Sequence, residues 1–295
     1  MATVRIGFIG LGRMGVPMAG NLLRAGFEVA GYDVNTQAGR DLAERPGFDR
    51  TESAQACVDA AEVVVLMLPD SSVVDRLLWE APGLAAAMQP GTLVIDMGSS
   101  DPLRSRSNAE RLVARGLEFI DAPVSGGVKR AIDGTLAIMA GGPKGSFERA
   151  RPVLQAMGRT LIHVGDAGAG HAVKALNNYV SAAGLIAVSE ALVAAEKFGI
   201  DPHLVNQVFN ASTGRNNTTE LKVEDFMLSK RYDSGFALAL MRKDVQTASQ
   251  FIDGMGTPGR FARECLGVAT MVEDALGAGA DHTAVHAYFA ALPGT

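Results

Sequence analysis

The sequence predicts an α/β fold, with a doubly wound, mostly parallel sheet in its first part and an all-helical second part. Short apolar runs alternate with helical patterns up to about residue 165, a glycine-rich turn follows the first run, and strand patterns almost vanish afterwards. From these three observations we expect a Rossmann-type domain over residues 1–165. A helical domain should follow over residues 166–295, beginning with a long connecting helix.

The apolar runs of the first part give the strands of the sheet. "VRIGFIG" leads into the glycine-rich turn, and the helical pattern "PMAGNLLRAG" closes at Gly26 before the next run. Most of the later runs leave a turn or a polar loop at their carboxyl ends, as strands of an α/β sheet do. The expected strands lie at residues 4–10, 27–33, 61–69, 91–99, 117–127, 134–142 and 159–165.

The second part carries helical periodicity. A proline-free stretch over residues 167–198 predicts one long helix, with Lys174 on or beside its apolar stripe. An unpaired buried ammonium is costly, so Lys174 either reaches solvent or is held there for a purpose. The predicted buried stripe consists of Val173, Leu176, Val180 and Ala183. Further helices are expected at residues 201–212, 218–228, 236–255, 258–276 and 282–292.

Composition limits the classes of partner. The net charge of -5 gives no electrostatic reason to expect nucleic acid or an anionic membrane surface. Cys57 and Cys265 are far apart and lack metal-ligand spacing, which argues against a disulfide scaffold or a cysteine-bound zinc. The first residues lack a signal-peptide pattern, so we expect a cytoplasmic protein.

The composition of the long apolar helix indicates whether it crosses a membrane and whether it packs against another subunit. The segment 179–195 is rich in alanine, contains Glu190 and is shorter than a membrane span, which favours a buried helix over a membrane helix. Part of such a helix is expected to pack against another subunit. We therefore predict a homodimer or a homotetramer.

The stretch "GFIGLGRMG" contains Gly10, Gly12 and Gly15 in the spacing G-x-G-x-x-G. It follows a predicted strand and opens a predicted helix, and Asp33 ends the second strand about 20 residues later. In that context Gly10 permits the tight turn, Gly12 admits a pyrophosphate close to the backbone, and Gly15 permits close packing of helix and strand. These features predict a dinucleotide cofactor.

Asp33 favours NAD over NADP. Its carboxylate can accept hydrogen bonds from the ribose hydroxyls of the adenosine half, and it would repel the 2′-phosphate of NADP. The residues directly after it, "VNTQ", contain no arginine to bind that phosphate. Arg13 and Arg40 are the residues that could reverse this preference.

Separated blocks of the chain resemble the β-hydroxyacid dehydrogenase family, which includes 3-hydroxyisobutyrate dehydrogenase and tartronate semialdehyde reductase. The blocks are "GFIGLGRMGVPMAGNLLRAG", "DAPVSGGVKRAIDGTLAIMAGG", "GAGHAVKALNN" and "LMRKD", and they extend over essentially the whole chain. The resemblance implies a substrate carboxylate bound at Ser125, Gly126 and Gly127. It also implies that Lys174 is the general acid/base at the substrate hydroxyl.

The same resemblance implies further site residues. Asn178 lies four residues after Lys174, on the same helical face, where its amide can orient the substrate or the lysine. Lys243 would reach the nicotinamide end of the cofactor, although an ordinary exposed lysine fits it equally well. The remaining cofactor loops would contribute Leu11, Arg13, Met14, Leu68, Pro69, Val73 and Ser99.

One segment departs from the family pattern. Residues 212–219 lie where relatives close the substrate pocket, and some relatives place an aromatic residue there. This chain has Arg215, Asn216 and Asn217 instead. Either the segment is a solvated loop, or it faces the pocket with Asn217 binding a more polar acid such as threonate, glycerate or serine.

Together these features predict reversible, NAD-linked oxidation of a small 3-hydroxyacid, similar to 3-hydroxyisobutyrate, to its semialdehyde. Lys174 would need a lowered pKa to act as a base near neutral pH. The alternatives are an NADPH-linked reductase of glyoxylate, succinic or tartronate semialdehyde, and a dinucleotide-binding module without catalysis. His163 and His171 lack metal-ligand spacing, so no metal is expected.

Overall fold

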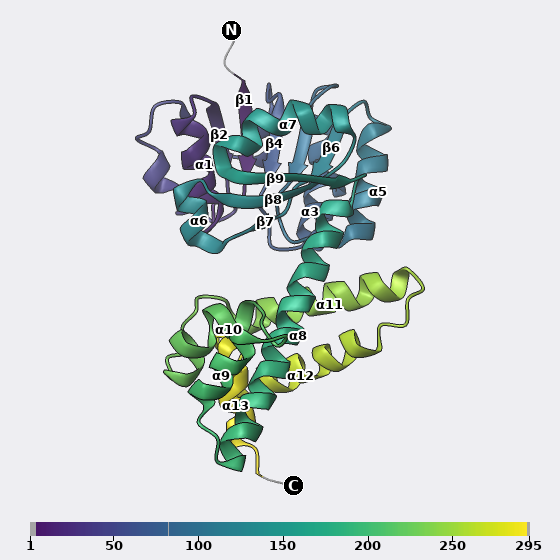
Figure 1. The fold of residues 1–295 in the computed structure, drawn as a ribbon. Coiled ribbons are helices and arrows are strands. Elements are labelled where there is room, and N and C mark those ends of the chain that lie inside the picture. The colour runs from purple at the N-terminus through teal and green to yellow at the C-terminus, as the bar shows by residue number, and fades with distance from the viewer. Residues whose placement is uncertain (1–3, 82, 294–295) are drawn as a thin grey trace. The chain divides into compact units, whose positions relative to one another are not determined.

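The fold is described from a computed structural model, which covers residues 4–81 and 83–293 (Figure 1). The chain divides into two compact units, Met1–Lys174 and Ala175–Thr295. We call them the sheet unit and the helical unit. The division falls inside one long helix, α8 (Ala169–Phe198).

The sheet unit contains a nine-stranded sheet in the order β3-β2-β1-β4-β5-β6-β8-β7, with β9 paired to β8. Strands β1 to β6 run parallel, whereas β8 is antiparallel to β6 and to β7. This sheet confirms the doubly wound, mostly parallel fold. The strands are β1 (Arg5–Ile9), β2 (Glu28–Tyr32), β3 (Phe48–Arg50), β4 (Val63–Leu66), β5 (Leu93–Asp96), β6 (Glu118–Asp121), β7 (Val124–Ser125), β8 (Leu136–Gly141) and β9 (Gly158–Gly165).

Helices cover both faces of this sheet. Within β4, Val63 and Val65 belong to one buried cluster, while Val64 and Leu66 belong to the cluster on the opposite face. The alternation explains why the parallel strands read as continuous apolar runs. The helical segments of the unit before α8 are α1 (Gly15–Arg24), η1 (Arg40–Leu42), α2 (Ala54–Val58), α3 (Ser71–Trp79), α4 (Leu84–Ala87), α5 (Pro102–Val113), α6 (Gly127–Asp133) and α7 (Lys144–Met157).

Strand order determines where a ligand can bind. β1 pairs with β2 on one side and with β4 on the other. The strands that follow β1 in sequence therefore extend the sheet first in one direction, through β2 and β3, and then in the other, from β4 onward. In sheets of this kind the loops at the carboxyl ends of the strands diverge at this switch point and leave a crevice. The glycine-rich loop follows β1 directly.

Among the described residues, the named elements of the helical unit are all helical and include most of α8, which confirms the all-helical second part. The other segments are α9 (Pro202–Ala211), α10 (Asn217–Leu221), η2 (Val223–Leu228, a π-helical turn), α11 (Leu238–Gly254), α12 (Arg260–Leu276), η3 (His282–Ala284) and α13 (Val285–Ala291). Their core includes Leu185, Leu192, Met227, Val245 and Val272, all of them fully buried.

The buried stripe of α8 differs from the predicted one. Val173 and Val180 are exposed, and Leu176 and Ala183 are only half-buried. The predicted stripe was wrong because alanine, serine and glycine surround the larger residues. Periodicity alone therefore does not determine which face of α8 is buried. The buried side chains are His171, Ala175, Ala182, Leu185, Ile186, Val188, Ser189, Leu192 and Val193.

Helix α8 is also long and apolar enough to cross a membrane by length and composition. A core helix meets the same criteria, and Leu185 and Leu192 of α8 pack into the core of the helical unit.

Both cysteines are buried free thiols. Burial raises the pKa of Cys57 to about 12 and that of Cys265 to about 11. Reactive cysteines need thiolate character near neutral pH, so neither thiol is expected to be a nucleophile.

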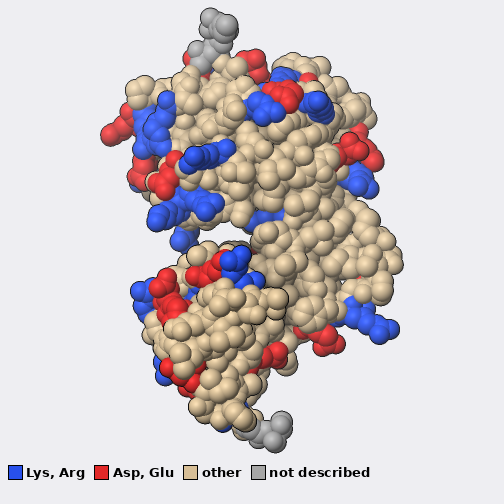
Figure 2. Space-filling model, viewed as in Figure 1, with Lys and Arg blue, Asp and Glu red and all other residues tan. Residues whose placement is uncertain are grey.

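Charged side chains of both signs are interspersed on the visible face of each unit (Figure 2). Several of them form local pairs, such as Arg149 with Glu118 at 2.8 Å between α7 and β6. Exposed pairs of this kind contribute little to stability.

Candidate active site

The glycine-rich loop has two glycines that the fold itself requires. Gly10 has a φ of +100°, and a Cβ there would lie 2.2 Å from the Met67 carbonyl oxygen. A Cβ on Gly15 would lie 1.8 Å from the Gly10 carbonyl oxygen. By contrast, a Cβ on Gly12 would meet no described protein atom within 4 Å. The space over Gly12 is therefore open, as close approach of a pyrophosphate requires.

The start of α1 is suited to the same group. No side chain among the described residues caps this helix, whose first turn contains no acidic residue. Arg13 and Gly12 are exposed and Met14 is half-buried at this end. Amides at a helix start attract anions, so the loop and α1 fit the dinucleotide phosphates.

Asp33 is held beside this loop by main-chain amides. Its Oδ2 accepts a hydrogen bond from Leu11 N at 2.7 Å, and its Oδ1 accepts one from Asn35 N at 2.8 Å. The carboxylate is half-buried, and each oxygen keeps capacity for a further donor. The carboxylate is thereby fixed in orientation, with acceptor capacity left for a ribose hydroxyl.

Arg50 is a residue that sequence reasoning missed. It ends β3, and its guanidinium donates to the Ala38 carbonyl and, at 3.2 Å, to the Asn35 carbonyl. Both carbonyls lie in the loop that follows Asp33. Arg50 therefore shapes this loop, and only the pairing of β3 with β2 brings it there.

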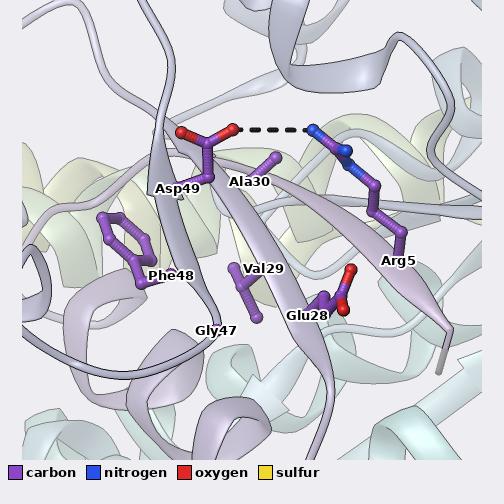
Figure 3. A pocket seen from close by; sticks show the side chains of 7 residues that line it. All are labelled: Arg5, Glu28, Val29, Ala30, Gly47, Phe48 and Asp49. Atoms are coloured by element: carbon purple, nitrogen blue, oxygen red, sulfur yellow. Dashed lines mark ion pairs between the residues drawn. The ribbon is translucent and has the colours of Figure 1, made fainter.

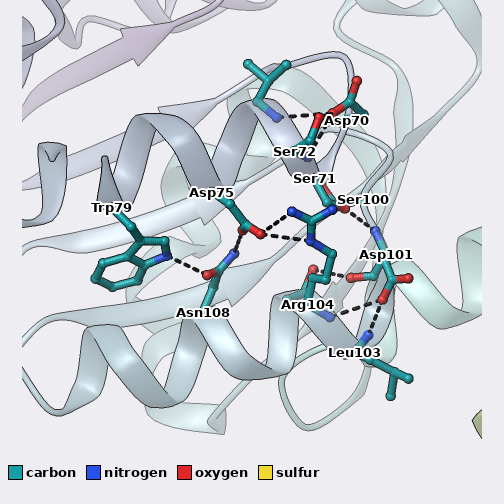
Figure 4. Close-up of polar contacts among 12 residues, drawn as sticks. Asp70, Ser71, Ser72, Asp75, Trp79, Ser100, Asp101, Leu103, Arg104 and Asn108 are labelled. Atoms are coloured by element: carbon teal, nitrogen blue, oxygen red, sulfur yellow. Dashed lines mark hydrogen bonds and ion pairs between the residues drawn. The ribbon is translucent and has the colours of Figure 1, made fainter. Parts of the chain in front are cut away.

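The loops after β4 and β5 are joined to each other. A Cβ on Gly98 would lie 2.7 Å from the Leu68 carbonyl oxygen, and the Ser71 Oγ accepts a hydrogen bond from Asp101 N at 2.5 Å. Asp70 and Asp101 cap α3 and α5 respectively (Figure 4). The predicted cofactor residues Leu68, Pro69, Val73 and Ser99 lie in these loops and in the first turn of α3.

The predicted carboxylate site lies at the end of β7. Ser125 is half-buried and pairs with Ala137 of β8. Gly126 and Gly127 have φ values of +130° and +66°, and both are exposed. A Cβ on Gly127 would meet no described atom within 4 Å, which leaves open space beside its amide. A hydroxyl and amides in such a turn can receive an anion.

Lys174 lies in the second turn of α8 and is half-buried. The start of α8 is bonded to the end of β6, because the Asp121 carboxylate accepts hydrogen bonds from Gly168 N and His171 N, each at 2.7 Å. Burial raises the pKa of the Asp121 carboxyl, while His171 and the two amides oppose that shift. Lys174 thus belongs to a helix that starts at the sheet edge carrying the cofactor loops.

Other predicted residues belong to the helical unit. The Asn178 Nδ2 donates to the Asp244 Oδ2 at 2.6 Å, which joins α8 to α11. Lys243, the neighbour of Asp244 on α11, is half-buried. The role of Asp244 as the partner of Asn178 was missed, since the two residues are far apart in sequence.

The polar segment 212–219 is largely engaged in its own structure. The Asn216 Oδ1 accepts from Thr219 N at 3.3 Å and the Thr219 Oγ1 accepts from Asn216 N at 2.9 Å, and these two bonds form a capping box at α10. Arg215 pairs with Glu220 at 3.6 Å, and Asn217 is exposed at the first position of α10. These contacts support the solvated-loop interpretation for Arg215 and Asn216.

A cavity of about 220 Å³ lies away from the predicted site residues. Its walls come from the starts of β1 and β2 and from β3 (Figure 3), so it contains none of the predicted site residues. Within residues 4–81 and 83–293, no group of three or more His, Cys, Asp or Glu side chains could hold a metal ion. The lining residues are Arg5, Glu28, Val29, Ala30, Gly47, Phe48 and Asp49.

Family models match both parts of the chain. Residues 5–165 match the NAD binding domain of 6-phosphogluconate dehydrogenase, and this match alone covers more than half of the chain. Residues 168–289 match the domain described as NAD-binding of NADP-dependent 3-hydroxyisobutyrate dehydrogenase. The two matches agree with the fold and with the dinucleotide fit of the glycine-rich loop.

Individual relatives agree with these matches. The 3-hydroxyisobutyrate dehydrogenase of Pseudomonas aeruginosa is 41% identical over 249 residues, covering 82% of this chain and 83% of that protein. The NAD-dependent L-serine dehydrogenase of the same organism is 37% identical over 252 residues, covering 83% of this chain and 84% of that one.

A solved structure of Mycobacterium tuberculosis 3-hydroxyisobutyrate dehydrogenase with L-serine superposes with a TM-score of 0.90. It is 35% identical and covers 98% of this chain and 100% of that chain. The chain therefore belongs to the β-hydroxyacid dehydrogenase family and is an NAD(P)-dependent hydroxyacid dehydrogenase.

Proposed function

We propose that this enzyme oxidises a small 3-hydroxyacid of the 3-hydroxyisobutyrate type to its semialdehyde, reversibly, with NAD as the preferred dinucleotide. The observation that carries the proposal is the attachment of α8 to the end of β6. It anchors the helix of Lys174 at the sheet edge that also carries the glycine-rich loop and Asp33. A proton-transfer group and a dinucleotide site then share one rigid support.

The chain's own residues divide the chemistry between them. Ser125 and the amides at Gly126 and Gly127 receive the substrate carboxylate and so orient the hydroxyl-bearing carbon. Lys174 accepts the hydroxyl proton during oxidation and returns it during reduction. Asn178, held by Asp244, orients the substrate or the lysine from one turn further along α8. A bound nicotinamide supplies the hydride acceptor.

The preference for NAD rests on Asp33 and Arg50. The Asp33 carboxylate is fixed by the Leu11 amide, so it cannot turn away from a 2′-phosphate without breaking that bond. The nearby Arg50 guanidinium is engaged by two loop carbonyls, which reduces its capacity to bind the phosphate. The description of the second family model names an NADP-dependent enzyme, so a direct titration of both dinucleotides is required.

The test is a substrate panel followed by dinucleotide absorbance. 3-Hydroxyisobutyrate, threonate, glycerate, serine and 4-hydroxybutyrate are each supplied with NAD⁺ and with NADP⁺. The proposal predicts the highest kcat/KM for a 3-hydroxyacid with NAD⁺. A higher kcat/KM for 4-hydroxybutyrate, or for NADP⁺ with every acid, would contradict it.

Serine is the second candidate substrate. One relative is named an NAD-dependent L-serine dehydrogenase, and the solved relative with the TM-score of 0.90 was obtained with L-serine. Serine has the carboxylate and 3-hydroxyl that the proposed site would bind, and it adds an ammonium group. Within the same panel, a kcat/KM for serine above that for 3-hydroxyisobutyrate would select this candidate.

We also propose that the enzyme is a homodimer or a homotetramer. Large apolar side chains are exposed in the helical unit, including Val180 on α8, Phe198 at its end and Phe261 on α12. Exposed apolar surface of this kind commonly marks a protein–protein interface.

A further inference from the structure

A buried polar cluster lies where β5 and β6 end, and none of its side chains has been given a role in the proposed proton or hydride transfer. It consists of Asp96, Ser105, Asp121 and His171, each with at most 2% of its surface exposed. Burial of such groups is costly unless they are bonded. These side chains meet at the start of α8, where they can hold that helix in place.

Asp121 acts as the cap of α8 from a neighbouring element. Gly168 precedes the helix and has no side chain with which to accept an amide hydrogen. The Asp121 carboxylate, at the end of β6, accepts from Gly168 N and His171 N, each at 2.7 Å. These are among the first amides of the helix, and a negative charge at that end is favourable.

The first turn of α8 also touches the sheet backbone directly. A Cβ on Gly170 would lie 2.4 Å from the Met139 carbonyl oxygen and 2.8 Å from that of Asp121. Just before the helix, a Cβ on Gly168 would lie 2.5 Å from the Pro102 carbonyl oxygen at the start of α5. The backbone at Gly168 and Gly170 therefore packs too closely against its neighbours to admit a side chain, and such close packing restrains the start of α8.

His171 connects the cap to two further elements. Its Nδ1 lies 2.7 Å from the Ser105 Oγ on α5 and 3.6 Å from the Asp121 Oδ2. Its Nε2 has no hydrogen-bond partner in the described part of the chain and lies 4.0 Å from the Asp96 Oδ2. Asp96 accepts from the Ser100 Oγ at 2.8 Å, in the loop that contains Ser99. The cluster therefore reaches from the lysine helix to a cofactor loop.

We propose that Asp121 and His171 are positioning residues for Lys174. They fix the first turn of α8 to the end of β6 and to α5, and Lys174 follows His171 by about one helical turn. The inference rests on the proposed function, in which Lys174 is the general acid/base. Proton transfer requires hydrogen-bond reach, and a displacement of about 1 Å can lower turnover by about 10²-fold.

The first test is Asp121→Asn. Asparagine has the same size, but its amide nitrogen cannot accept the second main-chain N–H. We expect kcat to fall by about tenfold while the Kd for the dinucleotide stays within about twofold. The matched control is Glu118→Gln at the opposite end of β6, where Glu118 pairs with Arg149, and its kcat should stay within about twofold. An unchanged kcat in Asp121→Asn would overturn the inference.

A double-mutant cycle separates positioning from general damage. If Asp121 acts through Lys174, adding Asp121→Asn to Lys174→Ala should lower the residual turnover by less than about twofold. Equal losses in both backgrounds would overturn the inference and leave the proposed function intact. Full turnover in Lys174→Ala alone would instead overturn the proposed function together with this inference.

A second pair of variants keeps the test usable if Asp121→Asn fails to fold. In His171→Asn the side chain can still bond with the Ser105 Oγ, whereas in His171→Leu it cannot. We expect His171→Leu to lose about tenfold in kcat and His171→Asn to recover part of that loss, at similar dinucleotide Kd. Equal kcat in His171→Leu and the wild-type enzyme would contradict the assignment.

Discussion

Some single residues of the proposed site could be recognised in the sequence, and others could not. Lys174 stood out in the sequence as a charge inside an apolar helix, and in the structure it is half-buried in the second turn of α8. The motif around Gly10, Gly12 and Gly15 could be predicted because the turn and the helix start that it forms depend only on a few consecutive residues. Asp121 and His171 could not be predicted as a pair, because 50 residues separate them and only the sheet brings them together.

The openness over Gly12 gives a direct prediction. Gly12→Ala should weaken dinucleotide binding by about tenfold, because the new methyl group occupies the space that the pyrophosphate needs. Gly145→Ala in α7 is the matched control, since its Cβ also meets no described atom within 4 Å. Binding is measured by fluorescence titration and folding by thermal melting. Equal affinities for the two variants would contradict a close approach of the pyrophosphate to Gly12.

Asp33 should control the choice of dinucleotide. Asp33→Ala removes the carboxylate that repels the 2′-phosphate and accepts from the ribose, so the ratio of kcat/KM for NAD⁺ over NADP⁺ should fall by about tenfold or more. Steady-state kinetics with both dinucleotides measures the ratio. If the ratio stays the same, another residue determines the preference.

At the scale of elements, each apolar run named in the first part of the sequence contains a strand of the structure, and the helical patterns of the second part correspond to helices. β3 was missed because its three residues are too few to show a period. The run 117–127 holds two short strands, β6 and β7, because Pro123 interrupts the pairing. The stripe of α8 was wrong because many small residues allow more than one apolar face.

One carboxylate supplies several of the hydrogen bonds in a connection between two elements. Asp281 accepts from Gly235 N at 2.8 Å, Thr283 N at 3.0 Å and the Ser234 Oγ at 2.9 Å, which joins the segment before α11 to η3. Burial raises the pKa of Asp281, but hydrogen bonds from His282, Thr283 and Ser234 outweigh burial and hold that pKa well below its usual value.

Asp281→Asn should therefore destabilise the enzyme by about 1–3 kcal/mol near neutral pH. A carboxyl with a lowered folded-state pKa contributes its full stability above its unfolded pKa of about 4, and this contribution is lost as the pH falls below that value. The difference in free energy of unfolding between variant and wild type should shrink in acid. Asp233→Asn, which breaks an exposed pair with Arg231, is the control and should change little. A difference that grows in acid would contradict this account.

For the whole molecule, the exposed apolar surface of the helical unit predicts assembly. Light scattering should give twice or four times the monomer mass, and Val180→Glu should reduce that mass or weaken the association. Val113→Glu in the sheet unit is the matched control, because Val113 is 60% exposed and Val180 is 66% exposed. A monomer for the wild-type enzyme would exclude the proposed homo-oligomer.

The central claim is that Lys174 transfers the proton in an NAD-linked oxidation of a 3-hydroxyacid. The most direct measurement compares the wild-type enzyme with Lys174→Ala in the rate of NADH formation from the best acid of the panel, with the Kd for NAD⁺ measured on the same samples. We expect kcat to fall by about 10²-fold or more while the Kd stays nearly unchanged. An unchanged kcat, or a loss explained entirely by weaker NAD⁺ binding, would contradict the claim.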